Sequence, residues 1–285
     1  MTNKLCLYQQ QHLRIKHKKI IQAKKVGQIF AIANQKGGVG KTTTCVNLAA
    51  SLVAIKKKVL LIDLDPQGNA TMGSGIDKND VPYTVYDVLI DDVSIDEAKQ
   101  CSPSGHYDVL PANGDLTAAE VQLFNKDNKE FGLRAALERV KERYHYILID
   151  CPPSLNMLTV NALAASNSVL IPMQCEYYAL EGLSSLMSTI EQIQLRTNPA
   201  LNIAGILRTM YDPRSTLTVD VSDQLKTHFG DKVYQACIPR NIRLAEAPSF
   251  GQPALVYDRL SKGAIAYLAL AGEFVRRCEI SRQTR

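Results

Sequence analysis

Short apolar runs, often β-branched, alternate with longer amphipathic stretches from residue 28 onward. The runs "VLLID" and "YILID" are almost wholly apolar, as expected of strands buried on both faces of a sheet. Repeated strand–helix units predict an α/β fold, with a mostly parallel, twisted sheet and helices on both faces in three layers. The predicted strands are Gln28–Ala33, Val59–Asp63, Tyr107–Pro111, Tyr146–Asp150, Ser168–Pro172, Ile203–Thr209 and Val233–Ile238.

The segments between these strands show helical periodicity. The predicted helices are Lys41–Lys56, Glu130–Arg143, Ser154–Ala165, Leu180–Thr197, Ser215–Phe229 and Lys262–Cys278. Residues 66–106 are rich in Gly, Asp and Pro, which predicts loops with one short helix near Val85–Leu89. No repeat, low-complexity linker or domain boundary interrupts the pattern. Right-handed crossovers should place ligands at the carboxyl ends of the strands.

Composition fits a globular chain of this kind. The 285 residues are 46% hydrophobic and 21% charged, and no apolar run approaches the 18 residues of a membrane span. The seven cysteines are scattered, odd in number and free of C-x-x-C pairs. Reduced thiols are therefore expected in place of a disulfide framework or a zinc site.

Positive charge is concentrated at the N-terminus. Residues 1–27 hold seven Lys and Arg and no acid, so residues 28–285 sum to −2 although the whole chain is +5. Such a basic leader can attract nucleic acid or a membrane surface. It can also be a disordered extension or a start chosen too far upstream, since Val26 would open directly into a core strand. A disordered extension or an upstream start is favoured over a binding role.

The stretch "NQKGGVGKTTT" follows the first strand and opens the first helix. It departs from the phosphate-loop pattern G-x-x-x-x-G-K-[ST], because Gln35 stands where the first glycine belongs and Lys36 is an additional lysine. Glycines let backbone amides approach an anion, and the helix start presents free N–H groups to it. Lys41 suits the β- and γ-phosphates, and the Thr42 hydroxyl suits Mg²⁺. The predicted phosphate-binding residues are Lys36, Gly37, Gly38, Val39, Gly40, Lys41, Thr42 and Thr43.

Carboxylates follow two of the apolar strands. Asp63 and Asp65 lie at the end of "VLLID", and both are expected to point toward the phosphate site. Acids beside a magnesium nucleotide can hold metal-bound waters or orient the attacking water. Asp150 ends "YILID" at the position of a Walker B acid, and Pro152 and Pro153 stiffen the exit from that strand.

These motifs resemble the ParA/Soj chromosome-partitioning ATPases of the deviant Walker A group, which also holds MinD and the nitrogenase iron protein. The resemblance runs from about residue 28 to 278 and implies a single ATPase domain over residues 28–280. It implies a P-loop NTPase fold and hydrolysis of ATP to ADP and phosphate with Mg²⁺. The stretches that carry it are "KGGVGKTT", "DLDPQGNAT", "DCPPSLNMLTVNAL", "QCEYYALEGL" and "IPRNIRLAEAPSFGQP".

The resemblance also implies residue roles. Lys36 matches the lysine that crosses an ATP-dependent homodimer interface to the partner's nucleotide, and Asp65 matches the water-activating aspartate. Asp63 would support the surroundings of the metal, which Thr42, Asp65 and Asp150 would hold. Met210, Pro239 and Asn241 match the adenine contacts. Arg214 and Arg243 match the positions for sequence-independent DNA binding, with help from Lys226, Lys232 and Arg240.

The expected function is an ATP-dependent switch of chromosome or plasmid partitioning. The ATP-bound dimer would sit on nucleoid DNA in the cytoplasm until a ParB-like centromere-binding protein stimulates slow hydrolysis. No integral membrane contact is expected.

Three other functions share parts of this pattern. A MinD-like membrane switch needs a basic amphipathic terminus, for which "FVRRCEISRQTR" is short and polar, whereas residues 1–27 interleave lysines with Leu and Ile. An iron–sulfur reductase needs cysteines at the dimer axis, and Cys151 and Cys175 are the nearest candidates. A scaffold that binds ATP without hydrolysis is disfavoured by the intact Lys36, Lys41, Asp65 and Asp150.

Overall fold

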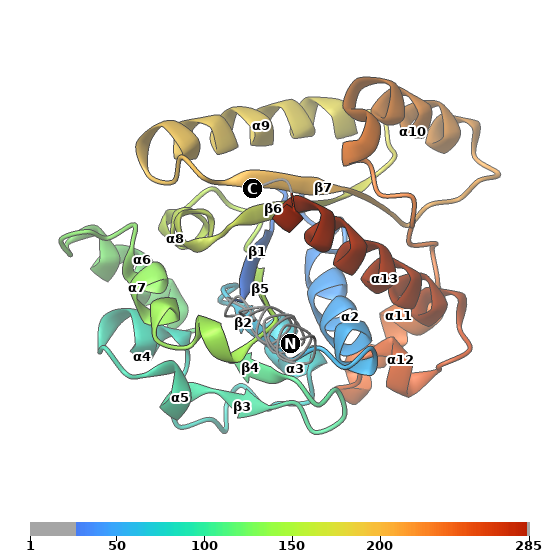
Figure 1. The fold of residues 1–285 in the computed structure, drawn as a ribbon. Helices are drawn as coiled ribbons and strands as arrows, with labels where there is room; N and C mark the ends of the chain where they lie inside the picture. The colour runs from blue at the N-terminus through green and yellow to red at the C-terminus, as the bar shows by residue number, and fades with distance from the viewer. Residues whose placement is uncertain (1–26, 284–285) are drawn as a thin grey trace, which may run out of the picture.

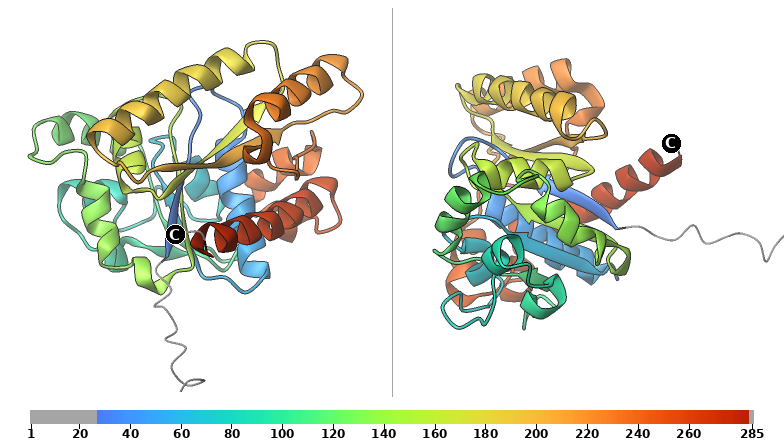
Figure 2. Two further views of the ribbon diagram at one scale, coloured as in Figure 1. Left: turned by 45° about the horizontal axis from the view of Figure 1, so that its top comes forward. Right: turned by 90° about the vertical axis from the view of Figure 1, so that its left-hand side faces the viewer.

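The computed structural model describes residues 27–283 as a seven-stranded sheet between two layers of helices (Figures 1 and 2). Its order is β3-β4-β2-β5-β1-β6-β7, and every pairing is parallel except that of β3 with β4. The strands are β1 Gln28–Ile32, β2 Val59–Asp63, β3 Gln100–Cys101, β4 Asp108–Leu110, β5 Tyr146–Asp150, β6 Ser168–Gln174 and β7 Asn202–Thr209. The predicted three-layer α/β/α fold is confirmed.

Each face of the sheet buries its own apolar cluster. Successive side chains of a strand point to opposite faces, so Ile147 and Ile149 join one cluster while Leu148 joins the other. The first face is covered by α4 Val85–Ile90, α5 Ile95–Ala98, α6 Leu116–Phe124, α7 Gly132–Glu138, α8 Met157–Ala165, α9 Ala179–Arg196 and α10 Thr216–Phe229. The second is covered by α2 Lys41–Ala54, α3 Asn69–Gly73, α11 Ile242–Glu246, α12 Ala254–Tyr257 and α13 Lys262–Gln283.

Several boundaries differ from the predicted ones. Residues 66–106 hold α3, α5 and the short β3 besides the expected α4. The helix predicted to begin at Ser154 starts at Met157, after the proline pair, because the Asn156 side chain caps it by accepting from the Thr159 N–H at 3.0 Å. The helix predicted over 130–143 ends earlier, and a 3₁₀ turn, η1 Lys141–Arg143, follows it.

The strand predicted over Val233–Ile238 is wrong. This segment runs beside β7 but makes only isolated bridges, Ile206↔Val233 and Tyr211↔Pro239. Side chains take the place of the missing ladder. The buried Arg208 guanidinium donates to the carbonyls of residues 234 and 235 at 2.9 and 3.1 Å, and Glu273 accepts from the amides of residues 235 and 236 at 2.9 and 2.8 Å. Two further 3₁₀ turns, η2 Gly230–Lys232 and η3 Ala247–Phe250, flank this region.

No helix within residues 27–283 has the length and apolar character needed to cross a bilayer. The predicted basic leader lies outside the described residues, apart from Gly27.

Glu273 gives a test of this side-chain scaffold. The residue is only 7% exposed, and its carboxylate accepts hydrogen bonds from two backbone amides and Arg277. We expect Glu273→Ala to lower the free energy of unfolding by about 2–3 kcal/mol, because buried donors lose their acceptor. The matched change Glu279→Ala, at an exposed position of α13, should stay within about 0.5 kcal/mol. Urea unfolding compares the two, and equal losses would contradict the assigned role.

Candidate functional site

The loop between β1 and α2 is held open by two glycines. Gly38 and Gly40 have φ values of 71° and 88°, in the left-handed region that other residues rarely adopt. Gly37 does not have a positive φ, so its expected conformational role is not seen; a Cβ there would meet no atom within 4 Å. Gly40 is the residue before α2, and the first amides of that helix therefore face the loop with no side-chain cap. This is the arrangement that binds phosphate.

Two residues that the sequence reasoning missed hold this loop. Asn34 donates to the Pro172 carbonyl of β6 at 2.8 Å and accepts from the Lys36 N–H at 3.0 Å. Thr209, at the end of β7, donates its hydroxyl to the Val39 carbonyl at 2.8 Å. The one available signal was a polar residue at the carboxyl end of a buried strand in each case.

Lys41 lies over the loop it follows. Its side chain is buried, and its Nζ donates to the Lys36 carbonyl at 3.1 Å. Burial lowers the pKa of this ammonium, while the charges of Asp150 and Asp65 act in the opposite direction. The structure therefore gathers Lys41, Asp65 and Asp150 around the start of α2, with Thr42 and Thr43 half-buried in its first turn.

Asp150 and Asp63 end neighbouring strands and face each other in register. Burial raises the pKa of Asp150 to about 8; the charge of Asp63 adds to the effect, and the Thr42 hydroxyl opposes it. One Asp150 oxygen contacts the Cys45 thiol at 3.5 Å, but its Oδ2 is buried without a hydrogen-bond partner. An orphaned buried carboxylate oxygen beside a threonine hydroxyl fits a magnesium site.

Asp63 holds the loop that follows β2 through both of its carboxylate oxygens. Its Oδ1 accepts from the Asp65 N–H at 3.1 Å, and its Oδ2 accepts from the Thr71 N–H and hydroxyl at 2.8 and 2.7 Å. The Thr71 hydroxyl in turn accepts from the Ala112 N–H at 3.0 Å. Both oxygens thus hold the loop that carries Asp65. Asp63 lies beside Asp150 in the register of the sheet, but its oxygens are occupied by these donors, so it positions Asp65.

Lys36 turns away from its own loop. Its Nζ forms an ion pair of 2.6 Å with Glu176, in the turn before α9, and the lysine side chain stays 42% exposed. The neighbouring Gln35 donates to the Thr189 hydroxyl on α9 at 3.1 Å. The exposed Tyr177 and Tyr178 pack edge to face beside this pair.

The three predicted adenine contacts line one pocket beside the phosphate loop. This pocket, of about 210 Å³, is lined by Met210, Pro239, Asn241, Gly40 and Thr43 among others. The Asn241 Oδ1 accepts from the Arg243 N–H at 3.1 Å and so caps α11. Its Nδ2 makes no hydrogen bond within residues 27–283 and remains available to an acceptor in the pocket.

The predicted DNA-binding arginines already have carboxylate partners. Arg214 is 88% exposed and binds Asp212 through two nitrogens at 2.9 and 2.8 Å. Arg243 pairs with Glu246 at 2.7 Å and with Asp258 at 3.3 Å. Exposed pairs of this kind contribute about 0–1 kcal/mol, so a phosphate can replace the carboxylate at small cost.

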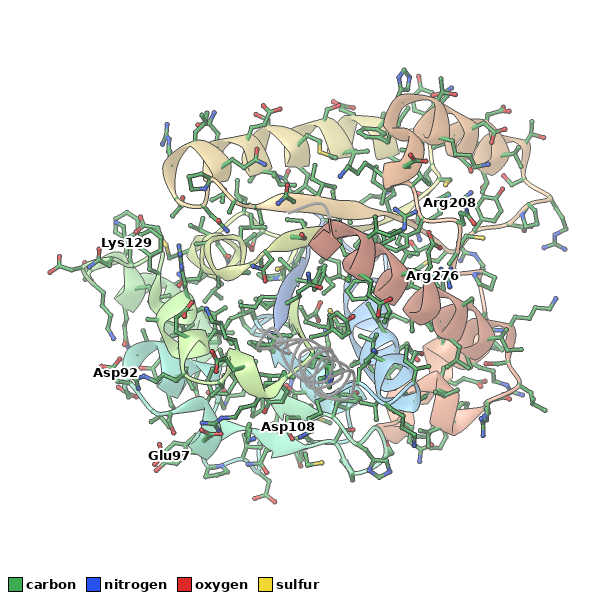
Figure 3. All side chains as sticks on the ribbon, in the orientation of Figure 1. Asp92, Glu97, Asp108, Lys129, Arg208 and Arg276 are labelled. Atoms are coloured by element: carbon green, nitrogen blue, oxygen red, sulfur yellow. The ribbon has the colours of Figure 1, made fainter. Side chains whose placement is uncertain are left out.

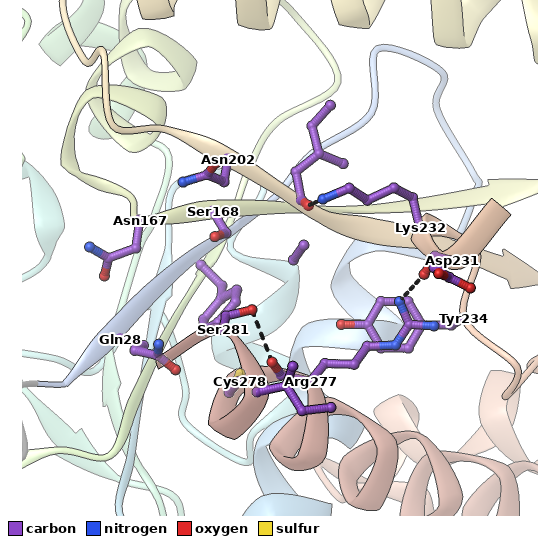
Figure 4. Close-up of a pocket in the computed structure, with 14 residues that line it drawn as sticks. Gln28, Asn167, Ser168, Asn202, Asp231, Lys232, Tyr234, Arg277, Cys278 and Ser281 are labelled. Carbon is purple, nitrogen blue, oxygen red and sulfur yellow. Dashed lines mark hydrogen bonds between the residues drawn. The ribbon is translucent and has the colours of Figure 1, made fainter. Parts of the chain in front are cut away.

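Among the three auxiliary cations, Arg240 lies near Arg214, since hydrogen bonds from Arg214 and the charges of both arginines lower the pKa of Asp212. Lys226 pairs with Asp223 at 2.9 Å. Lys232 lines a cavity of about 430 Å³ at the amino ends of β6 and β7, away from the phosphate loop (Figure 4). There it donates to the Ile203 carbonyl at 3.2 Å.

The candidate iron–sulfur ligands do not face a surface. Cys151 and Cys175 are 1% and 4% exposed and belong to the apolar cluster on the α8–α9 face. They fit the simpler reading as small core residues.

The buried acids predict a pH dependence. A raised carboxyl pKa means that the folded state holds a proton that the unfolded chain loses near pH 4. The contribution of this proton to the free energy of unfolding is complete below about pH 4. It is lost as the pH rises through about 8, the pKa of Asp150. We expect the melting temperature of the nucleotide-free protein in EDTA to fall as the pH rises from about 4 to about 8, and to level off above that.

Asp150→Asn should flatten that slope, whereas Asp223→Asn, at the surface, should leave it unchanged. Equal slopes in the two variants would show that Asp150 ionises normally.

Comparison with known proteins agrees with this site. An AAA domain family (AAA_31) matches residues 27–203. The sporulation initiation inhibitor protein Soj of Bacillus subtilis is 54% identical over 87% of this chain and 98% of its own length. The chromosome partitioning protein ParA of Myxococcus xanthus is 51% identical over 88% and 89%. A crystal structure titled cobyrinic acid a,c-diamide synthase, from Mycobacterium smegmatis with an ATP analogue and magnesium, has a TM-score of 0.78. It is 37% identical and covers 89% of this chain and 96% of its own.

These similarities confirm the predicted family, the P-loop fold, the ATPase class, and ATP with Mg²⁺ as its cofactors. The chain belongs to the ParA/Soj family of chromosome-partitioning ATPases.

Proposed function

We propose that this chain is the dimerising ATP switch of a DNA-partitioning system. The observation that carries the proposal is the position of Lys36, which belongs to the phosphate loop but extends toward Glu176 and solvent. Lys41 already occupies the inner side of the loop. A second lysine on the outer side is available to a phosphate of another subunit, where a closed site strengthens its charge. A two-fold axis would make this contact reciprocal.

The described residues divide the work of hydrolysis. Lys41 and the amides at the start of α2 hold the phosphates, while Met210, Pro239 and Asn241 hold the base. Mg²⁺ would be held by Thr42, Asp65 and Asp150, directly or through water, and would neutralise charge on the phosphates. Asp65 would orient the attacking water, and Asp63 and Thr71 keep the Asp65 loop in place. No residue among these is a strong general base, so slow turnover is expected.

DNA binding follows from pairing two copies of a weakly charged surface. Arg214 and Arg240 both lie near Asp212, after the end of β7, and Arg243 lies on α11, three residues after Arg240. Each of these contacts would be doubled in the dimer, and phosphate contacts are independent of base sequence. A ParB-like protein would stimulate hydrolysis and release the monomers. The resulting location is the cytoplasm, on the nucleoid.

A MinD-like membrane switch is the second candidate. The terminal helix α13 carries charged residues through its last turns, and the basic leader lies outside the described residues. Liposome co-sedimentation of the full chain, compared with a chain starting at Val26, distinguishes the two functions. Membrane binding with ATP in place of DNA binding would favour the membrane switch.

The chemistry of the site is tested by two variants. Lys41→Ala should lose nucleotide binding and, with it, ATP-dependent DNA binding, because the phosphates lose their buried cation. Asp65→Ala should keep DNA binding and reduce turnover at least about 100-fold, because the water is no longer oriented. ATPase rates and DNA gel shifts at low salt measure both. A wild-type protein that ignores DNA with ATP present would overturn the proposed function.

The interfaces are tested by two other variants. Lys36→Ala should bind ATP as a monomer and fail to dimerise, while Arg243→Glu should dimerise and fail to bind DNA. Sedimentation with ATP and Mg²⁺ measures the dimer, and Leu195→Ser, at an exposed position of α9, is the control. Normal dimerisation of Lys36→Ala would remove the role proposed for that lysine.

A further inference from the structure

Helix α6 carries an apolar patch that faces solvent. Leu116, Ala119 and Leu123 turn inward and are buried, whereas Val121 and Phe124 point outward and are 69% and 67% exposed. They are three residues apart and so lie on one face of the helix. Exposed neighbouring apolar side chains of this size often mark a contact surface. We call Val121 and Phe124 the α6 patch.

The surroundings of the α6 patch are acidic. Residues 115–130 carry four carboxylates, Asp115, Glu120, Asp127 and Glu130, against two lysines. Lys126 is occupied, because its Nζ donates to the carbonyls of Leu89 and Ile90 at the end of α4 at 3.2 and 2.6 Å. That contact also brings the exposed Asp91 and Asp92 of the α4 terminus close to α6.

The other lysine, Lys129, shows that the α6 patch can bind a cation. The Lys129 ammonium lies 4.0 Å from the centre of the Phe124 ring. Lys129 and Asp92 lie on the same side of the molecule in Figure 3. An aromatic face that holds a cation within an acidic rim is suited to Lys or Arg side chains of a partner. Charge complementarity thus favours a basic, amphipathic segment.

A second copy of this chain does not fit the same surface. A two-fold interface centred on the patch would bring each acidic group against its own equivalent, because both sides of such an interface are identical. Like charges at close range oppose such a pairing.

The α6 patch is connected to the nucleotide site. Glu120, next to Val121, accepts a hydrogen bond from the Asn156 amide. Asn156 caps α8, at the end of the loop that starts from Asp150, and the Thr159 hydroxyl donates to the Ser154 carbonyl of that loop at 2.7 Å. A ligand that moves α6 therefore acts on the loop that follows the metal-binding aspartate.

We propose that the α6 patch is the docking surface for a basic amphipathic segment of the ParB-like protein, and that Glu120 and Asn156 relay its binding to Asp150. This inference rests on the proposed function, because it names the surface through which that partner acts. Binding at α6 leaves the DNA-binding arginines free, so stimulation can occur while the protein is on DNA.

The test is a titration of the ATPase rate on DNA with the full-length ParB-like protein of the same cell. The double variant Val121→Ser/Phe124→Ser should keep its basal rate and DNA binding within about twofold. It should need at least about tenfold more partner for half-maximal stimulation, since the aromatic anchor is lost. Leu195→Ser, which removes an equally exposed apolar side chain elsewhere, should titrate as the wild type does.

Two further variants distinguish the role of the acidic residues around the patch from the role of Glu120 in transmitting partner binding. Asp127→Lys/Glu130→Lys should weaken the partner's effect at low salt and less so at high salt. Glu120→Ala should bind the partner, measured by fluorescence anisotropy, and respond with a smaller maximal rate.

The outcomes are distinct. Undiminished stimulation of the patch variant would overturn the docking surface and leave the proposed function intact. Loss of the ATP-dependent dimer in the patch variant would show that α6 is a self-interface. Wild-type protein that no ParB-like protein stimulates would overturn the proposed function together with this inference.

Discussion

The placement of buried charge at one edge of the sheet governs the rest of this structure. Parallel pairing sets Asp63 opposite Asp150, and α2 brings Lys41 close to Asp150 and Asp65. Carboxylates and an ammonium that are removed from water are costly unless they are paired or hydrogen-bonded. The protein meets this requirement unequally: Asp63 is satisfied by three donors, whereas Asp150 keeps an unpartnered oxygen. Asp63 is therefore a supporting residue, whereas Asp150 has an oxygen available to a metal ion.

The same need to pair buried polar groups determines the backbone path in the second half of the chain. Beside β7, the backbone of residues 233–238 is served by Arg208 and Glu273 from two different elements. A regular eighth strand would pair with its neighbour all along its length. The irregular path instead leads directly into Pro239 and Asn241, which face the pocket beside the phosphate loop. The side of the pocket that carries Pro239 and Asn241 thus depends on side chains outside it.

Ion pairs balance the exposed arginines of a chain whose body is near neutral. Arg214 and Arg243 are held by neighbouring carboxylates in the monomer, which keeps the surface weakly charged. In the proposed DNA-bound dimer, phosphates would exchange with those carboxylates, and doubling of the contacts would make the exchange cooperative. Lys36 is balanced in the same way by Glu176; in the proposed dimer, a more strongly charged phosphate would take the place of that carboxylate.

The sequence by itself determined the layered fold, the phosphate loop and the acids that close its strands, because apolar periodicity and glycine spacing are local signals. It also identified Lys36 as a lysine surplus to an ordinary phosphate loop. Only the tertiary structure decided that Asp63 positions Asp65, that Asn34 and Thr209 hold the loop, and that residues 233–238 are not a strand. Those outcomes depend on partners such as Thr71, Arg208 and Glu273, which lie far along the chain or on other elements. Local propensity carries no information about where such donors and acceptors meet. The role of Asp63, the support of the loop and the irregular path of residues 233–238 therefore follow from hydrogen bonds between elements.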